Sequence, residues 1–221
     1  MKNEIEEFIA YLRIERKLSD STIRAYKYTL YMIKSIIQKE LISLNSEDIE
    51  KYLTVIKSKK QASSINHEIT VLNEFYKYNN IDVMKNIYHL KVASSLPKYL
   101  TIEEVNNLLN IKLSTAYDYR NKAILELMYA TGLRVSELRG LKLNDVDTFN
   151  SVVRVIGKGN KERIVPIGNV AIKYLNIYLS EYRDKLLKNN IKDEIFVNNH
   201  GNKLTTNGIN YILKKISKDI I

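Results

Sequence analysis

The chain has 221 residues, enough for one large or two small domains, and 45% of them are hydrophobic, as is usual for globular proteins. The absence of cysteine excludes disulfides, a thiolate nucleophile and a cysteine-ligated metal; no apolar run reaches the ~20 residues of a membrane span, and no signal peptide is expected. The absence of cysteine also fits a reducing compartment, so we expect a cytoplasmic protein. Of the net charge of +10, residues 1–98 contribute +4 (16 Lys and Arg against 12 Asp and Glu) and residues 99–221 contribute +6 (19 against 13). Because both halves are basic, we expect a polyanionic partner that contacts both.

Residues 1–80 predict a compact bundle of four short amphipathic helices. Polar stretches at 18–22, 45–48 and 57–61 separate the helices or offer residues that cap a helix start. Between these stretches, apolar residues recur every three or four positions, which is typical of helices that bury one face. The apolar positions are Ile5, Phe8, Ile9 and Leu12; Ile23, Tyr26, Leu30, Ile33 and Ile37; Ile49, Leu53 and Ile56; and Ile65, Ile69, Leu72 and Tyr76.

Residues 81–98 lack clean periodicity and predict a linker, with a helical turn near Val83 and Met84. Residues 99–221 predict a second domain that is mainly helical. Its first helix follows a capping box of Thr101 and Glu104, and another is expected over about 118–130.

A β-branched run at 151–156, a turn at 157–160 and a return at 162–167 predict an antiparallel hairpin. A helix with one apolar face, a short strand at 195–197 and a last helix from 205–206 follow. The whole chain is therefore predicted to be mainly α with a small antiparallel β-sheet (α+β). The apolar helical positions are Ile172, Leu175, Leu179, Tyr182 and Leu186, and Ile209, Ile212, Leu213 and Ile216.

The phrase A-T-G-L-R-V-S-E-L at residues 130–138 is a candidate anion site. Gly132 ends the preceding helix and can take the positive φ of a C-cap, and Arg134 follows at the start of the next helix. A guanidinium donates two hydrogen bonds to a phosphate, and Glu137, one turn further, could orient it. The alternative is an ordinary solvated pair between Arg134 and Glu137.

A second phrase, G-K-G-N-K-E-R at residues 157–163, places Lys158 at the tip of the predicted hairpin, where Gly157 and Gly159 permit a tight turn and close approach to DNA. Together the two phrases resemble the catalytic domain of the tyrosine recombinases, the phage-integrase and Xer-type family. In that family the first phrase carries a catalytic arginine and the second a catalytic lysine. The phrases around residues 18–26 and 62–69 resemble helix starts of the family's N-terminal core-binding (SAM-like) domain.

The resemblance implies three domain segments: a DNA-binding helical domain over 1–80, a linker over 81–98, and a partial tyrosine-recombinase catalytic domain over 99–221. It implies phosphoryl transfer in DNA recombination and DNA integration without metal or other cofactor, with Arg134 and Lys158 catalytic and Glu137 supporting. Hydroxyl, amide and basic groups at helix starts and on the hairpin would contact the phosphates of double-stranded DNA. These DNA-binding candidates are Thr22, Arg24, Tyr26, Ser63, Asn66, Lys161 and Arg163. The alternative for those in the first half is that they are plain helix caps and solvated side chains.

The family's second box, H-x-L-R-H, and its nucleophilic tyrosine have no counterpart in this sequence. We therefore expect a chain truncated before that box and unable to cleave DNA alone, so that its standing as an enzyme is open. The alternatives are a non-catalytic, recombinase-derived module that binds DNA or regulates, and a basic helical protein unrelated to DNA. Partners would be double-stranded DNA and other recombinase protomers, with no membrane. We also expect Ile212, Ile216, Ile220 and Ile221 to be unusually exposed.

Overall fold

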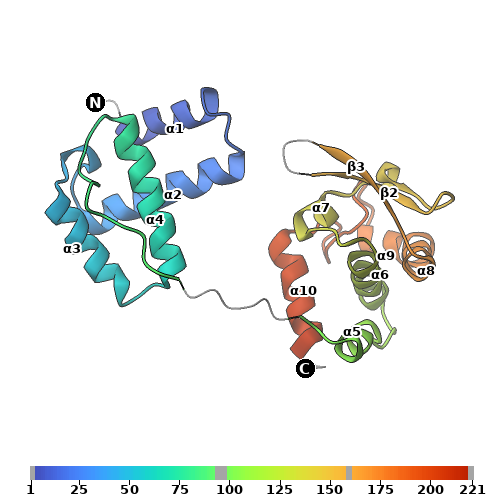
Figure 1. Ribbon diagram of the computed structural model, residues 1–221. Coiled ribbons are helices and arrows are strands. Elements are labelled where there is room, and N and C mark those ends of the chain that lie inside the picture. The colour runs from blue at the N-terminus through green and yellow to red at the C-terminus, as the bar shows by residue number, and fades with distance from the viewer. Residues whose placement is uncertain (1–2, 93–98, 158–160, 219–221) are drawn as a thin grey trace. The chain divides into compact units, whose positions relative to one another are not determined.

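The computed structural model describes residues 3–92, 99–157 and 161–218 of the chain (Figure 1). Contacts between Cα atoms divide it into two compact units, residues 1–96 and 97–221, and each is described by itself. Among the described residues, no helix is both long enough and apolar enough to cross a membrane.

The first unit is a helical bundle whose helices begin at the polar stretches expected from the sequence. Ser19 caps the second helix by accepting a hydrogen bond from the Thr22 N–H, and Asn45 and Asp48 form a capping box at the third. A short 3-10 turn, η1, lies between these two helices. The elements are α1 (Glu4–Ile14), α2 (Asp20–Ile37), η1 (Leu41–Ser43), α3 (Ser46–Lys57) and α4 (Ala62–Tyr78).

The core of this bundle consists of the predicted apolar faces. Most of the predicted positions are buried, while Tyr26, Ile37 and Leu53 are partly buried against the core. Tyr52 and Phe75, which lie in α3 and α4, join it.

The segment after α4 differs from the predicted linker. Residues 81–90 pack onto the bundle, with Met84 buried and Ile87 and Leu90 partly buried against its core. Where a helical turn was expected near Val83, the structure has a single hydrogen-bonded turn, with the Ile87 N–H donating to the Met84 carbonyl over 3.0 Å. These apolar residues pack on the bundle although their spacing shows no helical periodicity.

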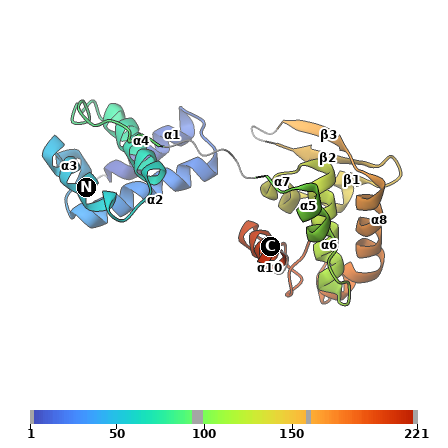
Figure 2. The same cartoon turned by 60° about the horizontal axis from the view of Figure 1, so that its bottom comes forward.

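The second unit is built around α6, whose buried face packs on α8 and α9, while α10 packs on α7 (Figure 2). The predicted capping box at the start of α5 is present, with Thr101 accepting from the Glu104 N–H over 3.2 Å. α8 and α9 are joined by a π-helical segment, η4, which makes one long helical path of the predicted apolar face. The elements are α5 (Ile102–Leu109), α6 (Ala116–Thr131), α7 (Val135–Gly140), η2 (Leu143–Asp145), α8 (Asn169–Ile177), η4 (Tyr178–Tyr182), α9 (Arg183–Leu187) and α10 (Thr206–Lys218).

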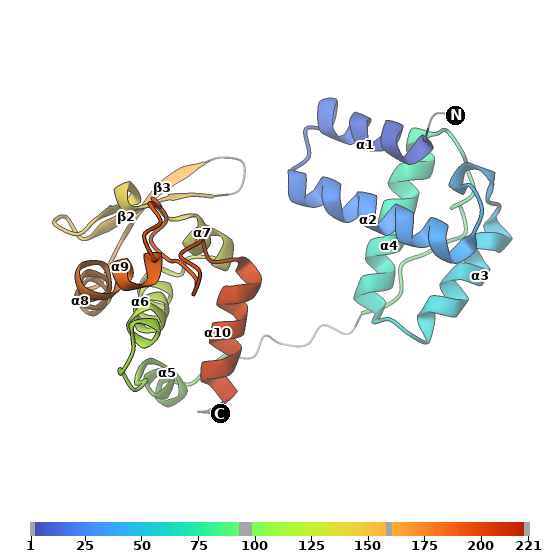
Figure 3. The ribbon, with the colours of Figure 1, turned by 180° about the vertical axis from the view of Figure 1, so that it is seen from behind.

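Within the described residues of this unit, three strands form one antiparallel sheet in the order β1-β2-β3, with β1 at Val146–Asp147, β2 at Val152–Ile156 and β3 at Glu162–Pro166. The predicted hairpin of β2 and β3 is present, whereas β1 was not predicted. Val153 and Val155 of β2 face the core. Figure 3 shows the hairpin reaching past the short helix α7.

Two local expectations were wrong. Residues 195–197 form no continuous strand: the residues on either side of Ile195 and Phe196 make isolated bridges, Lys142 with Glu194 and Val197 with Lys203. Ile195, Phe196 and Val197 are all buried, so the side chains do not alternate between two faces as in an ordinary strand. The expected exposure of Ile212 is also wrong, because it is buried in the core with Ile209.

Ile216 is partly buried against the core of the second unit, which again differs from the exposure expected of it. Ile220 and Ile221 lie outside the described residues. α10 therefore packs on α7 and buries Ile209 and Ile212 in the core of this unit.

Candidate active site

The turn between α6 and α7 brings Arg134 to the surface on a fixed backbone. Gly132 caps α6 in the left-handed conformation, with φ 61°, and its N–H donates to the Met128 carbonyl over 2.9 Å. Leu133 and Leu138, on either side of Arg134, are buried and anchor the turn in the core. The predicted C-cap is confirmed, and Arg134 takes the N-cap position of α7.

Glu137 lies one turn into α7, with its carboxylate beneath Arg134. Its Oε2 accepts the Arg134 backbone N–H over 2.9 Å, and its Oε1 accepts Nη1 of the Arg134 side chain over 3.2 Å. The side chain of Glu137 is only 5% exposed, whereas that of Arg134 is 74% exposed. The carboxylate therefore holds the base of the arginine while most of the guanidinium faces solvent.

A second arginine reaches the same carboxylate from the hairpin. Arg163 lies on β3 opposite Val155, and its Nη1 and Nη2 donate to Oε1 and Oε2 of Glu137, both over 2.9 Å. The two residues are 26 positions apart in the sequence. This two-pronged geometry is the strongest form of an ion pair between arginine and a carboxylate.

The two arginines set the charge state of the site. Hydrogen bonds from Arg163, and then from Arg134, lower the pKa of Glu137 to about 2, against the desolvation that would raise it. The same pairing raises the pKa of Arg163. At neutral pH the group Arg134–Glu137–Arg163, called the arginine–glutamate cluster below, therefore carries a net charge of about +1 on a largely exposed guanidinium.

The base of the hairpin loop lies against this cluster. The Gly157 N–H donates to the Lys161 carbonyl over 2.8 Å, which closes the loop. A Cβ at Gly157 would lie 3.2 Å from Nη1 of Arg163 and 3.6 Å from Oε1 of Glu137. A side chain at Gly157 would therefore press on the ion pair. Lys161 is exposed, while Lys158 and Gly159 lie outside the described residues.

The DNA-binding candidates of the first unit are spread over two helices and have different surroundings. Arg24 and Ser63 are exposed. The Thr22 hydroxyl lies 2.9 Å from that of Ser19, within the cap of α2. Tyr26 is half-buried, with its ring edge-on to His67, and burial raises its pKa.

Asn66 differs from the other candidates, because its side-chain amide is bonded to the segment that follows α4. Its Nδ2 donates to the Leu90 carbonyl over 2.9 Å, and its Oδ1 accepts the Leu90 N–H over 2.7 Å. The sequence offered no sign of this contact, because residues 81–90 carry no periodic pattern that would have placed them on the bundle.

A groove of about 660 Å³ runs between α2 and α4 beside Ser63. On its α4 side lies Glu68, a buried carboxylate that accepts from the Tyr52 hydroxyl over 2.6 Å and pairs with Lys60. Tyr28, which is 68% exposed, contributes the facing side of the groove and was missed from the sequence. In the sequence, Tyr28 lies off the apolar stripe of its helix, and this position is the signal that could have marked it.

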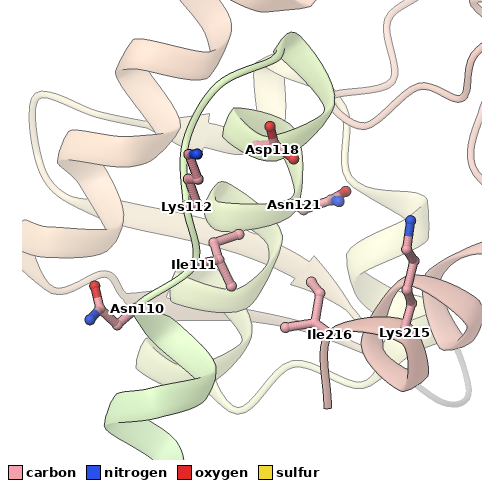
Figure 4. Close-up of a pocket in the computed structure, with 7 residues that line it drawn as sticks. All are labelled: Asn110, Ile111, Lys112, Asp118, Asn121, Lys215 and Ile216. Carbon is pink, nitrogen blue, oxygen red and sulfur yellow. The ribbon is translucent and has the colours of Figure 1, made fainter. Parts of the chain in front are cut away.

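Another pocket, of about 380 Å³, lies between the loop after α5, the start of α6 and α10 (Figure 4). Its polar lining includes Lys112, Asp118, Asn121 and Lys215. The Asp118 carboxylate belongs to the capping box of α6, where it accepts a hydrogen bond from the Thr115 N–H over 2.8 Å. The pocket shares no lining residue with the arginine–glutamate cluster, so it is not the predicted site.

The comparisons with known proteins cover both units. Residues 98–220 match the model of the phage integrase family, and residues 5–80 match that of the phage integrase N-terminal SAM-like domain. Tyrosine recombinase XerD of Oceanobacillus iheyensis is 41% identical over 226 residues, which cover 96% of this chain and 76% of that protein. Tyrosine recombinase XerD of Halalkalibacterium halodurans is 36% identical over 233 residues, which cover 100% of this chain and 78% of that protein.

Solved structures share the fold. The XerH site-specific recombinase bound to its difH substrate has a TM-score of 0.71 at 19% identity, covering 98% of this chain and 68% of that one. A lambda integrase tetramer bound to a Holliday junction has a TM-score of 0.73 at 14% identity, covering 97% of this chain and 62% of that one. The mainly helical architecture with a small antiparallel sheet and an N-terminal SAM-like domain is thus confirmed.

Proposed function

Because this chain belongs to the phage integrase family of tyrosine recombinases, with Xer-type relatives, we propose that it binds double-stranded DNA through both units and takes part in site-specific DNA recombination. The observation that carries this proposal is the arginine–glutamate cluster at the turn between α6 and α7. An exposed guanidinium held from below by a buried carboxylate is poised for an anion that arrives from solvent. The charge of +10, distributed over both units, supports a polyanionic partner.

In this proposal Arg134 donates to the phosphodiester oxygens on which charge builds during strand exchange. Its backbone N–H and one Nη1 hydrogen are tied to Glu137, so the remaining donors point outward with little freedom to reorganise. Lys158 is proposed as the acid that protonates the leaving 5′-oxygen, on the strength of the family phrase alone. Lys161, on the same loop, would contact the DNA backbone.

In the first unit, the exposed Arg24 and Ser63 are proposed to contact backbone phosphates from α2 and α4. Tyr26 and Thr22 would support the surface around the groove between these helices. Asn66 is proposed to act indirectly, without contacting DNA, by fixing residues 81–90 on the bundle. Its Nδ2 and Oδ1 are both bonded to the backbone of Leu90. The structural neighbours include XerH bound to difH and lambda integrase bound to DNA as a dimer and as a tetramer. These complexes support a DNA-bound oligomer as the working form of this chain.

We further propose that the 221 residues alone form no covalent phosphotyrosine intermediate. The sequence has no H-x-L-R-H phrase, and Tyr211, 69% exposed on α10, has no such phrase before it. A suicide DNA substrate, which traps a cleaved strand on the enzyme, tests this directly. The chain should yield no adduct alone. It should be assayed as well with a full-length XerD-type protein, which could complete the site from a neighbouring protomer.

An adduct formed by the purified chain alone and mapped to Tyr211 or another tyrosine would overturn the proposal of an incomplete site. Binding is tested separately, by selecting duplexes from a random library and titrating the selected duplex against salt. Several phosphate contacts should make the affinity fall steeply as salt rises. Cutting the chain between its units should weaken binding severely, because the tether supplies a high local concentration of the second unit.

A further inference from the structure

We propose that Arg163 is a positioning residue: through Glu137 it holds the β2–β3 hairpin against the start of α7, and so keeps Arg134 free for phosphate. This inference rests on the proposed function of Arg134. It departs from the expectation that Arg163 contacts DNA, because Nη1 and Nη2 each already donate a hydrogen bond to one carboxylate inside the protein.

The first observation is the geometry of the pair. Both nitrogen–oxygen distances are 2.9 Å, and the side chain of Glu137 is 5% exposed against 40% for Arg163. If Arg163 swung out to a phosphate, this buried carboxylate would lose both bonds of its two-pronged partner, at a cost in free energy that exceeds the gain from a solvent-exposed contact. Lysine has no planar fork and could not make both bonds.

The second observation is that the same carboxylate also serves Arg134. Oε2 of Glu137 accepts the Arg134 N–H, and Oε1 accepts its Nη1 at 3.2 Å, a longer contact than either bond from Arg163. While Arg163 neutralises Glu137, the Arg134 side chain makes one bond to this carboxylate, and its other donors remain available to a phosphate. Without Arg163, the unpaired negative charge would draw the Arg134 guanidinium down onto Glu137 and away from phosphate.

The third observation is the fit of Gly157. A Cβ at this position would lie 3.2 Å from Nη1 of Arg163, a tight contact that would press on the ion pair. Gly157 also closes the loop through its bond to the Lys161 carbonyl. The base of the loop and the ion pair are therefore in close proximity.

The test compares Arg163→Ala, Arg163→Lys, Glu137→Gln and the double variant Arg163→Ala/Glu137→Gln, with Arg154→Ala as matched control. Arg154 lies on the opposite face of the sheet and pairs with Asp145 instead. Two measurements are made on the full chain: the pKa of the Glu137 carboxyl by carbon-detected NMR, and the salt dependence of affinity for the selected duplex. Amide spectra verify that each variant is folded.

We expect the pKa of Glu137 to rise from about 2 toward its ordinary 4.5 in both Arg163→Ala and Arg163→Lys, and to stay unchanged in Arg154→Ala. Arg163→Ala should weaken DNA binding about tenfold, the value of one charged hydrogen bond. The double variant removes one charge of each sign, so it should regain the wild-type salt slope and part of the affinity.

A phosphate-contacting Arg163 would behave differently. The salt slope would then fall by about 0.9 in Arg163→Ala and remain equally low in the double variant, and Arg163→Lys would bind almost as wild type; this pattern would overturn the inference. If Arg163→Ala does not fold, the affinity of Arg163→Lys decides the matter, because a positioning role predicts weaker binding and a phosphate contact predicts nearly wild-type binding. A wild-type chain that binds no duplex would contradict the proposed function, while the pKa of Glu137 in the free chain would still test the positioning role.

Discussion

Each unit of this chain contains a buried carboxylate on a helix, and the two are used in different ways. Glu68 of α4 and Glu137 of α7 are equally buried, at 8% exposure of the whole residue. The partners of Glu68 are Lys60 and the buried hydroxyl of Tyr52, whose pKa is raised by burial and by this bond. The partners of Glu137 are two arginines that extend to the surface.

The difference lies in what the carboxylate presents to solvent. Glu68 ties α3 to α4 through the buried hydroxyl of Tyr52, so we expect its main effect to be on stability. Glu137 ties the start of α7 to a hairpin and holds a guanidinium that is 74% exposed, so the same type of buried group organises a surface cation. A buried carboxylate marks a site for an anion only when its partners face outward.

The largest expected effect follows from removing the charge of Glu137. Glu137→Gln should lower the free energy of unfolding of the second unit by about 2–3 kcal/mol, because two arginines lose a charged acceptor. Chemical denaturation followed by the amide resonances of β2 and β3 measures it. The matched control is Asp145→Asn, which removes a carboxylate that pairs with Arg154 and accepts the Lys142 N–H, so that one arginine and not two loses a charged acceptor. Equal losses of unfolding free energy in the two variants would contradict the claim that Glu137 stabilises this unit more than a carboxylate paired with one arginine.

Arg134→Ala should separate binding from stability. Its guanidinium is mostly exposed, so unfolding should change little, while affinity for the selected duplex should fall by about 1–3 kcal/mol through loss of a charged contact. Lys158→Ala is expected to weaken binding less, because a mobile lysine that acts late in the reaction is only loosely held beforehand. Arg154→Ala is the control for a change of net charge, and a fall of equal size there would indicate a general charge effect.

The pH dependence of stability should distinguish the two units. The folded pKa of Glu137 is about 2 and its ordinary value is 4.5, so the unfolded state takes up a proton first and the stabilisation is lost as the pH falls from 4.5 toward 2. Between about pH 5 and about pH 3 the second unit should lose about 1 kcal/mol, allowing for solvent around the arginines. Glu137→Gln should abolish this part of the slope, and a slope that survives in it would have another origin.

The smallest effect is expected at Asn66 in the first unit. Asn66→Ala removes both bonds to Leu90 and should speed hydrogen exchange at the Leu90 amide by a factor corresponding to about 1 kcal/mol. Ser63→Ala, on the exposed start of α4, should leave that exchange unchanged and reduce DNA affinity slightly. If Asn66→Ala instead left exchange at Leu90 unchanged and lowered DNA affinity, Asn66 would be a direct DNA contact.

The features that the sequence predicted correctly are local ones. The C-cap at Gly132, the helix start near Asn45, the capping box at Thr101 and the β2–β3 hairpin each depend on residues a few positions apart, where local backbone geometry decides. The roles assigned to Arg134, Lys158 and the DNA-binding residues remain predictions from family phrases.

The features that the sequence missed depend on packing over long separations. Glu137 had two arginines to choose from, and the nearer one in sequence, Arg134, makes the weaker side-chain bond. Only the folded hairpin brings Arg163 within reach. Residues 81–90 are similar, because their place on the bundle depends on an amide of α4 and not on their own pattern.

The most direct test of the account is the dependence of DNA affinity on salt for the wild-type chain and for Arg134→Ala, on the same selected duplex. We expect a steep line for the wild type, and for the variant a weaker affinity with a slope smaller by about 0.9, the contribution of one phosphate contact. Two coincident lines would mean that Arg134 touches no phosphate, and would contradict the central claim that Glu137 holds this arginine for DNA.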